Sequence, residues 1–157
     1  MTVVAVTGHR HLGDPAAARS AIRAALADEP RPLVGLSTLA AGADQLFADV
    51  VLELGGSLEV LIPSAEYSET LDAPARAGFD RLCAAARSVA VLPPVPDRED
   101  QYVAAGEAML DRCDVLLAVW DGQPGRGAGG TADMVARARA RGLPVRVVPA
   151  GRDAGPD

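Results

Sequence analysis

Residues 115–131 read VLLAVWDGQPGRGAGGT, the most hydrophobic strand-like run of the chain followed by a glycine-rich loop. A continuous apolar run such as Val115 to Val119 is typical of a strand buried on both faces of a sheet. The glycines between Gly122 and Gly130 precede Thr131, and a helix is predicted to follow from about Ala132 to Arg141. A strand, a glycine-rich loop and a helix in this order predict one unit of an α/β fold.

The same alternation continues along the rest of the chain. Short apolar runs at about 3–6, 33–39, 58–62, 89–92 and 145–148 predict five more strands. Helical spacing at about 15–29, 46–54, 75–86 and 99–112 predicts four more helices, and Asp14 before Pro15 is a natural start for the first. The polar stretch 64–72 predicts a loop. Six strands alternating with five helices predict a Rossmann-like, doubly wound parallel sheet with helices on both faces and the first strand central.

The length and the ends of the chain suit one globular unit. With 157 residues and no internal repeat, we predict a single domain over 1–150 and a polar tail over 151–157. Neither a signal segment nor a run long enough to cross a membrane is evident, so we expect a cytoplasmic protein with no membrane partner. Cys83 and Cys113 lie in apolar contexts, which favours two buried reduced thiols over a disulfide or a metal site.

Charge limits the partners that the sequence predicts. All 15 Lys+Arg residues are arginines, and with 21 Asp+Glu the formal net charge is -6. The lack of lysine excludes a lysine Schiff base and the lysine of a P-loop. No segment is densely basic, so we expect no duplex nucleic acid as a partner. A small phosphorylated ligand is compatible with this charge, because helix N-termini and one or two arginines are enough to hold it.

Unusual residue types gather where the predicted strands end. In open α/β sheets the ligand lies outside the carboxyl ends of the strands, at the point where the strand order reverses. We therefore predict a ligand site made from strand-end residues: Thr7, Gly8, His9, Arg10, Ala41, Gly42, Asp44, Tyr67, Trp120, Asp121, Gly127, Gly129, Gly130 and Thr131.

Each group of these residues has a possible role and an ordinary alternative. The glycines let the backbone approach a phosphate, with Thr131 as N-cap, or they form a plain connection. Arg10 is either a phosphate fork or a surface arginine. Asp44 accepts hydrogen bonds from a ribose, fixes a neighbouring loop or complements the helix dipole.

The remaining polar and aromatic residues leave similar alternatives. Tyr67 and Trp120 stack on a base or simply pack in the fold. His9 and His11 alternate along the chain without a convergent third ligand, so we predict no metal and no cofactor.

The residues at these strand ends also resemble a known superfamily. The segment from Tyr102 to Val145, above all the runs 113–122 and 129–135, is similar to the SLOG superfamily. The opening Val6-Thr7-Gly8-His9-Arg10 and the stretch Ala41-Gly42-Ala43-Asp44 carry the same resemblance, which covers nearly the whole chain. It implies a Rossmannoid domain that binds nucleotides or nucleotide-derived ligands, and some bacterial members of the superfamily are thought to sense nucleotide signals.

One branch of this superfamily consists of the cytokinin-activating phosphoribohydrolases, related to lysine-decarboxylase-like proteins. These enzymes are typically dimers and carry a Gly-Gly-x-Gly-Thr-x-x-Glu motif with a functional glutamate. Aligned on Gly130-Thr131, this chain has Met134 at the glutamate position, and Asp133 lies about 100° away on the helix. The resemblance therefore implies a phosphate site and a homodimer, with the segment 103–110 as a candidate pairing surface.

Three functions are compatible with these observations. The first is binding or sensing of a nucleotide-like ligand. The second is hydrolysis of an N-glycosidic or phosphate bond, with Glu66, Asp121 or Asp133 as the catalytic carboxylate. The third is a purely structural role in an assembly. The missing lysine, the missing metal set and Met134 favour binding over catalysis.

Overall fold

The computed structural model describes residues 1–125 and 127–151. Six parallel strands form one sheet in the order β4-β3-β2-β1-β5-β6. This confirms the predicted doubly wound fold, with β1 inside the sheet between β2 and β5. Most of the predicted tail lies outside the described residues, as does Arg126 of the glycine-rich loop. The strands are β1 Thr2–Gly8, β2 Leu33–Ser37, β3 Ser57–Ile62, β4 Ser88–Val91, β5 Val115–Trp120 and β6 Val145–Pro149.

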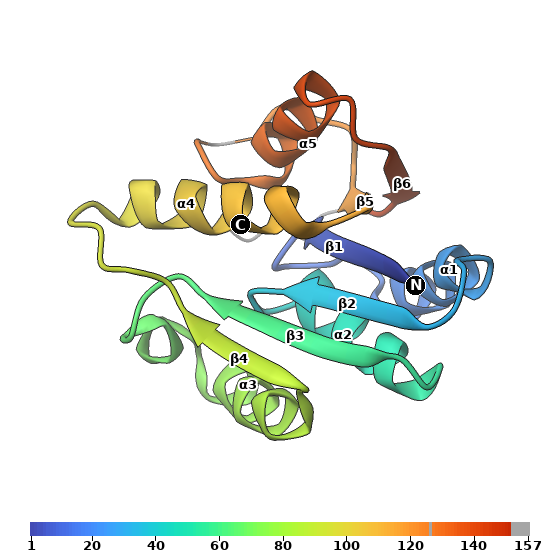
Figure 1. The fold of residues 1–157 in the computed structure, drawn as a ribbon, viewed down its shortest axis with the longest axis horizontal. Coiled ribbons are helices and arrows are strands. Elements are labelled where there is room, and N and C mark those ends of the chain that lie inside the picture. Colours follow the sequence, from blue (N-terminus) through green and yellow to red (C-terminus); the bar gives the residue numbers. More distant parts are fainter. Residues whose placement is uncertain (126, 152–157) are drawn as a thin grey trace.

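Five α-helices cover the two faces of the sheet. Helices α1 (Pro15–Ala27), α2 (Ala43–Glu53) and α3 (Ala73–Ala85) pack on one face, and α4 (Arg98–Arg112) and α5 (Thr131–Ala140) pack on the other (Figure 1). Asp14 caps α1 as predicted, because its Oδ1 accepts a hydrogen bond from the Ala17 N–H at 3.1 Å.

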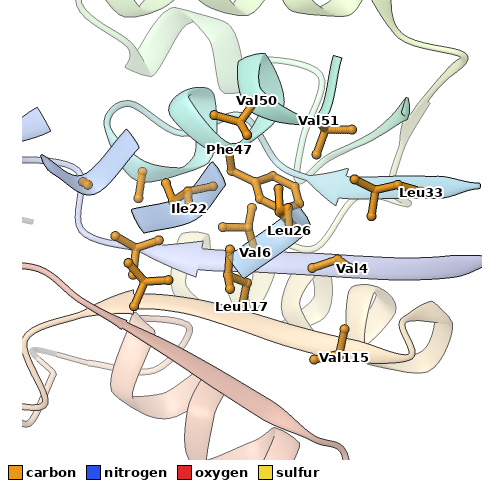
Figure 2. Close-up of a cluster of buried hydrophobic side chains, with 14 of the residues drawn as sticks. Val4, Val6, Ile22, Leu26, Leu33, Phe47, Val50, Val51, Val115 and Leu117 are labelled. Atoms are coloured by element: carbon orange, nitrogen blue, oxygen red, sulfur yellow. The ribbon is translucent and has the colours of Figure 1, made fainter. Parts of the chain in front are cut away.

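Alternating residues of β1 anchor two separate hydrophobic clusters. Val4 and Val6 point to the cluster that holds Ile22 of α1 and Phe47 of α2 (Figure 2). Ala5 points to the opposite cluster, where Met109 of α4 and Met134 of α5 are buried. Because β1 has apolar neighbours on both faces, its carboxyl end is held firmly in place.

The path of the chain defines one reversal in the strand order. From β1 the chain moves outward through β2 and β3 to the β4 edge, and α4 then carries it back across the sheet to β5 (Figure 1). Strands β1 and β5 are neighbours, although their connections leave in opposite directions. The crevice outside their carboxyl ends is where open sheets of this kind bind ligands.

Several local expectations were wrong in detail. Strand β2 ends at Ser37 rather than at residue 39, because Leu39 has φ 57° and its N–H donates to the Ser37 hydroxyl at 2.9 Å. A 3-10 helix, η1 (Tyr67–Thr70), interrupts the predicted loop at 64–72. Gly130 is the N-cap of α5, and Thr131 is its first helical residue. Met109 and Leu110 are buried, so that part of the segment 103–110 is not a free pairing surface. In the described part of the chain no helix is both long enough and apolar enough to cross a membrane.

Candidate ligand-binding site

A cavity of about 510 Å³ opens at the carboxyl ends of β1, β2 and β5, at the reversal of the strand order. This volume falls in the range of small-molecule sites. The glycine-rich loop and the first turns of α4 and α5 form one wall of the cavity. The loop after β1, Thr38 and Asp44 after β2, and Tyr67 of η1 form the other.

Most of the strand-end residues predicted from the sequence line this cavity. Those that line it are Thr7, Gly8, His9, Arg10, Asp44, Tyr67, Trp120, Gly127, Gly129, Gly130 and Thr131. Ala41, Gly42 and Asp121 are not among the lining residues, nor are the candidate carboxylates Glu66 and Asp133. The role of each lining residue as a ligand contact stays a prediction.

The loop after β1 is locked against its neighbours. A Cβ on Gly8 would lie 2.4 Å from the Ala43 Cβ, so only glycine fits this contact with α2. His9 is buried, and its Nε2 accepts a hydrogen bond from the Asp121 N–H at 3.0 Å. The hydroxyls of Thr7 and Thr131 lie 3.3 Å apart. These contacts tie the ends of β1 and β5 and the start of α5 into one floor.

Gly42 explains how α2 approaches this floor so closely. Its φ is 77°, and a Cβ would lie 2.5 Å from the Arg10 carbonyl oxygen and 2.6 Å from that of His9. The next residue, Ala43, donates its N–H to the His9 carbonyl at 3.1 Å. Gly42 therefore shapes the site from behind, which is why it does not line the cavity.

Asp44 is the buried carboxylate of the site. Its side chain is only 5% exposed, and its Oδ2 accepts hydrogen bonds from the hydroxyls of Thr38 at 3.1 Å and Ser37 at 3.4 Å. Burial raises the pKa of Asp44 to about 7, although these hydroxyls, the Ala40 backbone and the Arg10 charge act in the opposite direction. Burial, together with the nearby Asp44 charge, also raises the pKa of Tyr67.

The glycine-rich loop uses two of its amides for internal contacts. The Ala128 N–H donates to Glu99 Oε1 at 2.9 Å, and the Gly129 N–H donates to Asp133 Oδ2 at 2.7 Å. Asp133 Oδ2 also accepts a hydrogen bond from Arg137 Nε at 2.8 Å, so it supports the loop instead of facing the cavity. The start of α5 has no side-chain cap, which leaves its first amides oriented for an anion.

Sequence reasoning missed two groups of lining residues. Thr38 was assigned to the interior of a strand, because the apolar run through Leu39 hid the end of β2. The start of α4, which includes Asp97, Glu99 and Tyr102, was read as an ordinary helix start. The strand order indicates these residues: a helix that returns from an edge strand to the centre of the sheet must pass the place where the strand order reverses.

Comparison with solved structures identifies several proteins of similar fold. The chain superposes on DNA processing protein A (DprA) from Streptococcus pneumoniae with a TM-score of 0.68 and 20% identity, over 96% of this chain and 51% of that one. DprA from Helicobacter pylori gives a TM-score of 0.65 and 18% identity, over 99% and 68%. The molybdenum cofactor binding protein from Rippkaea orientalis gives 0.59 and 17%, over 93% and 75%. The chain shares their fold.

At these identities the likeness concerns the fold, and the chain spans about half the length of the S. pneumoniae protein. No protein-family model matches the chain, and no curated protein matches its sequence.

One expectation about partners is corrected by this comparison. The net charge of -6 led us to expect a small molecule and no duplex nucleic acid as the partner, yet the H. pylori DprA structure describes a single-stranded DNA binding mode on a chain of this fold. That expectation was wrong in leaving out single strands, because net charge governs long-range attraction to a duplex. Base stacking and local contacts, which also hold single strands, do not depend on net charge.

Proposed function

We propose that the cavity binds a nucleotide or a nucleotide-derived small ligand, as a binding or sensing module of the SLOG type. The observation that carries the proposal is the cavity of about 510 Å³ at the reversal between β1 and β5. Its two walls differ in chemistry, with backbone amides and glycines on one side and Asp44 beside Tyr67 on the other. A ligand with an anionic end and a polar, ring-containing end matches such a pair of walls.

In this proposal the start of α5 binds the anionic end of the ligand. Thr131 contributes a hydroxyl there, and the uncapped amides carry the positive end of the helix dipole. Arg10 lines the same cavity, is exposed, and supplies a permanent positive charge. Glu99 and Asp133 already occupy the Ala128 and Gly129 amides, so the contact with the anion falls on α5 itself.

Hydrolysis is the alternative activity, and the arrangement of carboxylates supports it less well. Of the three carboxylates that line the cavity, Asp97 caps α4 and Glu99 accepts from the Ala128 N–H, so both are engaged in the fold and Asp44 is left to contact a ligand, whereas most glycosidases use a pair of carboxylates. Met134, at the position of the motif glutamate, is buried against Gly106. A glycosidase carboxylate must be available to the sugar in the transition state.

We also propose that the chain forms a homodimer, through the free edge of β4. Among the residues that the structure describes, this strand pairs with β3 alone, and Val89 and Val91 are 45% and 54% exposed. An exposed apolar edge strand is a template for pairing with another chain. Light scattering at micromolar concentration tests the dimer: a monomer mass contradicts it, and Val91→Arg should shift a dimer toward monomer.

The test of ligand binding is a thermal-shift screen with nucleoside mono-, di- and triphosphates and a short oligothymidylate, followed by calorimetric titration. Ligand at one hundred times its Kd stabilises a fold by about 2.7 kcal/mol, which gives a measurable rise in Tm. If no nucleotide shifts the transition, the proposal fails. If only the oligonucleotide does, the site serves single strands.

Two variants then locate the bound ligand. Gly130→Val places a side chain at the start of α5. A Cβ there meets the Gly127 carbonyl oxygen at 3.4 Å, an ordinary van der Waals contact, so we expect the fold to tolerate the change. The side chain should block the contact between the anion and the α5 amides. Gly151→Val, with nothing within 4 Å of its Cβ, is the matched control. Arg10→Ala should weaken binding by about 1.5–3 kcal/mol. The exposed Arg139 of α5 supplies the arginine control, Arg139→Ala. Unchanged affinity in folded Gly130→Val contradicts the anion contact.

A further inference from the structure

We infer that Asp44 selects the ligand of this cavity by accepting hydrogen bonds from a pair of adjacent neutral donors. The 2′- and 3′-hydroxyls of a ribose and the imino and amino groups of a guanine edge both present such a pair. The inference rests on the proposed function and adds to it the class of ligand group that is recognised by the wall holding Asp44 and Tyr67.

The surroundings of Asp44 leave it able to accept from a ligand. A carboxylate has about four acceptor positions. The Thr38 and Ser37 hydroxyls both approach Oδ2, at 3.1 and 3.4 Å, and the Ala40 backbone supplies one more hydrogen bond. At least one acceptor position is left, and the contact to Ser37 is long enough for a second ligand donor to compete with it.

Charge argues for neutral donors on the ligand. In the described part of the chain no arginine or histidine lies within 4 Å of the Asp44 carboxylate, so burial of its charge is poorly compensated. Additional hydrogen bonds to the ionised form would offset that cost. Arg10 acts on the same carboxyl from the β1 loop, and Tyr67 faces it from η1. A cationic ligand group would therefore meet the like charge of Arg10, whereas neutral donors would not.

The position of Asp44 suits the uncharged part of a nucleotide. Asp44 follows β2 and Thr131 follows β5, and these strands flank β1 in the sheet. Two strand spacings separate them, which is roughly 10 Å. A ligand whose phosphate lies at the start of α5 must therefore reach Asp44 with its sugar or its base.

The experiment compares nucleotides that differ by one donor. The affinities of AMP and dAMP report the sugar, and those of GMP and IMP report the amino group of the base. All four are measured on the wild type, on Asp44→Asn and on Asp80→Asn, an exposed aspartate of α3. We expect at least a tenfold preference for the ligand with the extra donor in one of the two pairs. This preference should persist in Asp80→Asn and fall below about threefold in Asp44→Asn.

Each outcome of this comparison is decisive. If no nucleotide binds the wild type, the proposed function fails and this inference fails with it. If nucleotides bind but neither pair is discriminated, only the inference is overturned. This result is measured on the wild type alone, so it does not depend on the folding of a variant. Discrimination that persists unchanged in folded Asp44→Asn also overturns it. Where the preference lies in the AMP and dAMP pair the donors are sugar hydroxyls, and where it lies in the GMP and IMP pair they belong to the base.

Discussion

The two walls of the cavity are built in different ways. The wall formed by the β1 loop and the start of α2 is interlocked, with Gly8 against Ala43 and Gly42 against two carbonyl oxygens. The wall formed by the glycine-rich loop is mostly exposed, and single hydrogen bonds to Glu99 and Asp133 hold it. Buried, densely packed regions open only at high free energy, whereas exposed loops with few contacts open readily. The first wall is therefore preformed, and the second can adjust to the anion of the proposed ligand.

The largest expected effect concerns the charge inside the preformed wall. Folding raises the pKa of Asp44 from its ordinary value of 3.8 to about 7, so the folded state binds this proton more tightly than the unfolded state does. The free energy of unfolding should therefore fall as the pH rises from about 4 to about 7 and level off above that, by up to about 4 kcal/mol from this group. Urea denaturation across this pH range, on wild type and Asp44→Asn, measures the effect.

Asp44→Asn should flatten this pH dependence, since asparagine does not titrate in the range. Asp80→Asn provides the comparison, because Asp80 is exposed on α3. If the free energy of unfolding of Asp44→Asn varied with pH in parallel with that of the wild type, the Asp44 carboxyl would not be desolvated in solution. The preformed wall would then be more open to water than in the structure.

The second prediction tests the packing of the same wall. Gly42→Ala should lower the free energy of unfolding by about 3 kcal/mol, because it combines a left-handed φ of 77° with a Cβ within 2.6 Å of two carbonyl oxygens. Gly55→Ala is the matched control: its φ is 80°, but nothing lies within 4 Å of its Cβ. It should cost only the backbone strain, about 1 kcal/mol. Chemical denaturation of both variants compares the interlocked glycine with an open glycine of similar φ, and equal losses would contradict the interlocked wall.

The third prediction makes the corresponding change in the other wall. Gly129 has φ 81°, and a Cβ there would lie 2.8 Å from the Tyr102 Cβ. Gly129→Ala, like Gly42→Ala, combines a positive φ with a close contact of the new Cβ. It should nevertheless lower the free energy of unfolding by only about 1–2 kcal/mol, because an exposed loop can move away from the clash. The same denaturation experiment measures it. A loss as large as that of Gly42→Ala would mean that the two walls are equally rigid.

The sequence predicted the fold well because its signals are local. Apolar runs mark strands such as β5, and Asp14-Pro15 marks the start of α1, without knowledge of anything distant. The ends of elements were less accurate where a side chain competes with the backbone. Ser37 ends β2 by accepting the Leu39 N–H, and no periodicity reveals such a contact. At residues 67–70 a single turn of helix is too short to produce a periodic pattern.

The candidate site was predictable only in part, because it depends on strand order. Thr7, Asp44 and Gly130, which the strand-end rule predicted as site residues, line one cavity, and their contact with a ligand stays a prediction. The rule did not reveal Tyr102, whose place at the cavity follows from the return of α4 across the sheet. Nor did it reveal that Glu99 and Asp133 occupy loop amides, since those pairs meet only in three dimensions.

The smallest expected effect concerns Glu99, which links α4 to the adjustable wall. Glu99→Ala removes the acceptor of the Ala128 N–H but leaves the Gly129 N–H bonded to Asp133, which Arg137 holds in place. The hydrogen bond is exposed, so the free energy of unfolding should change by less than about 1 kcal/mol. The local effect should be larger: the Ala128 amide should exchange hydrogen faster while those of β1 do not change. Hydrogen exchange resolved to single amides measures both.

The Glu99 carboxylate also adds negative charge beside the start of α5. Its removal should therefore strengthen binding of an anionic ligand by a few-fold. Unchanged exchange of the Ala128 amide would contradict the hydrogen bond to Glu99, and weaker binding of the nucleotide would show that Glu99 holds this wall in the shape the ligand needs.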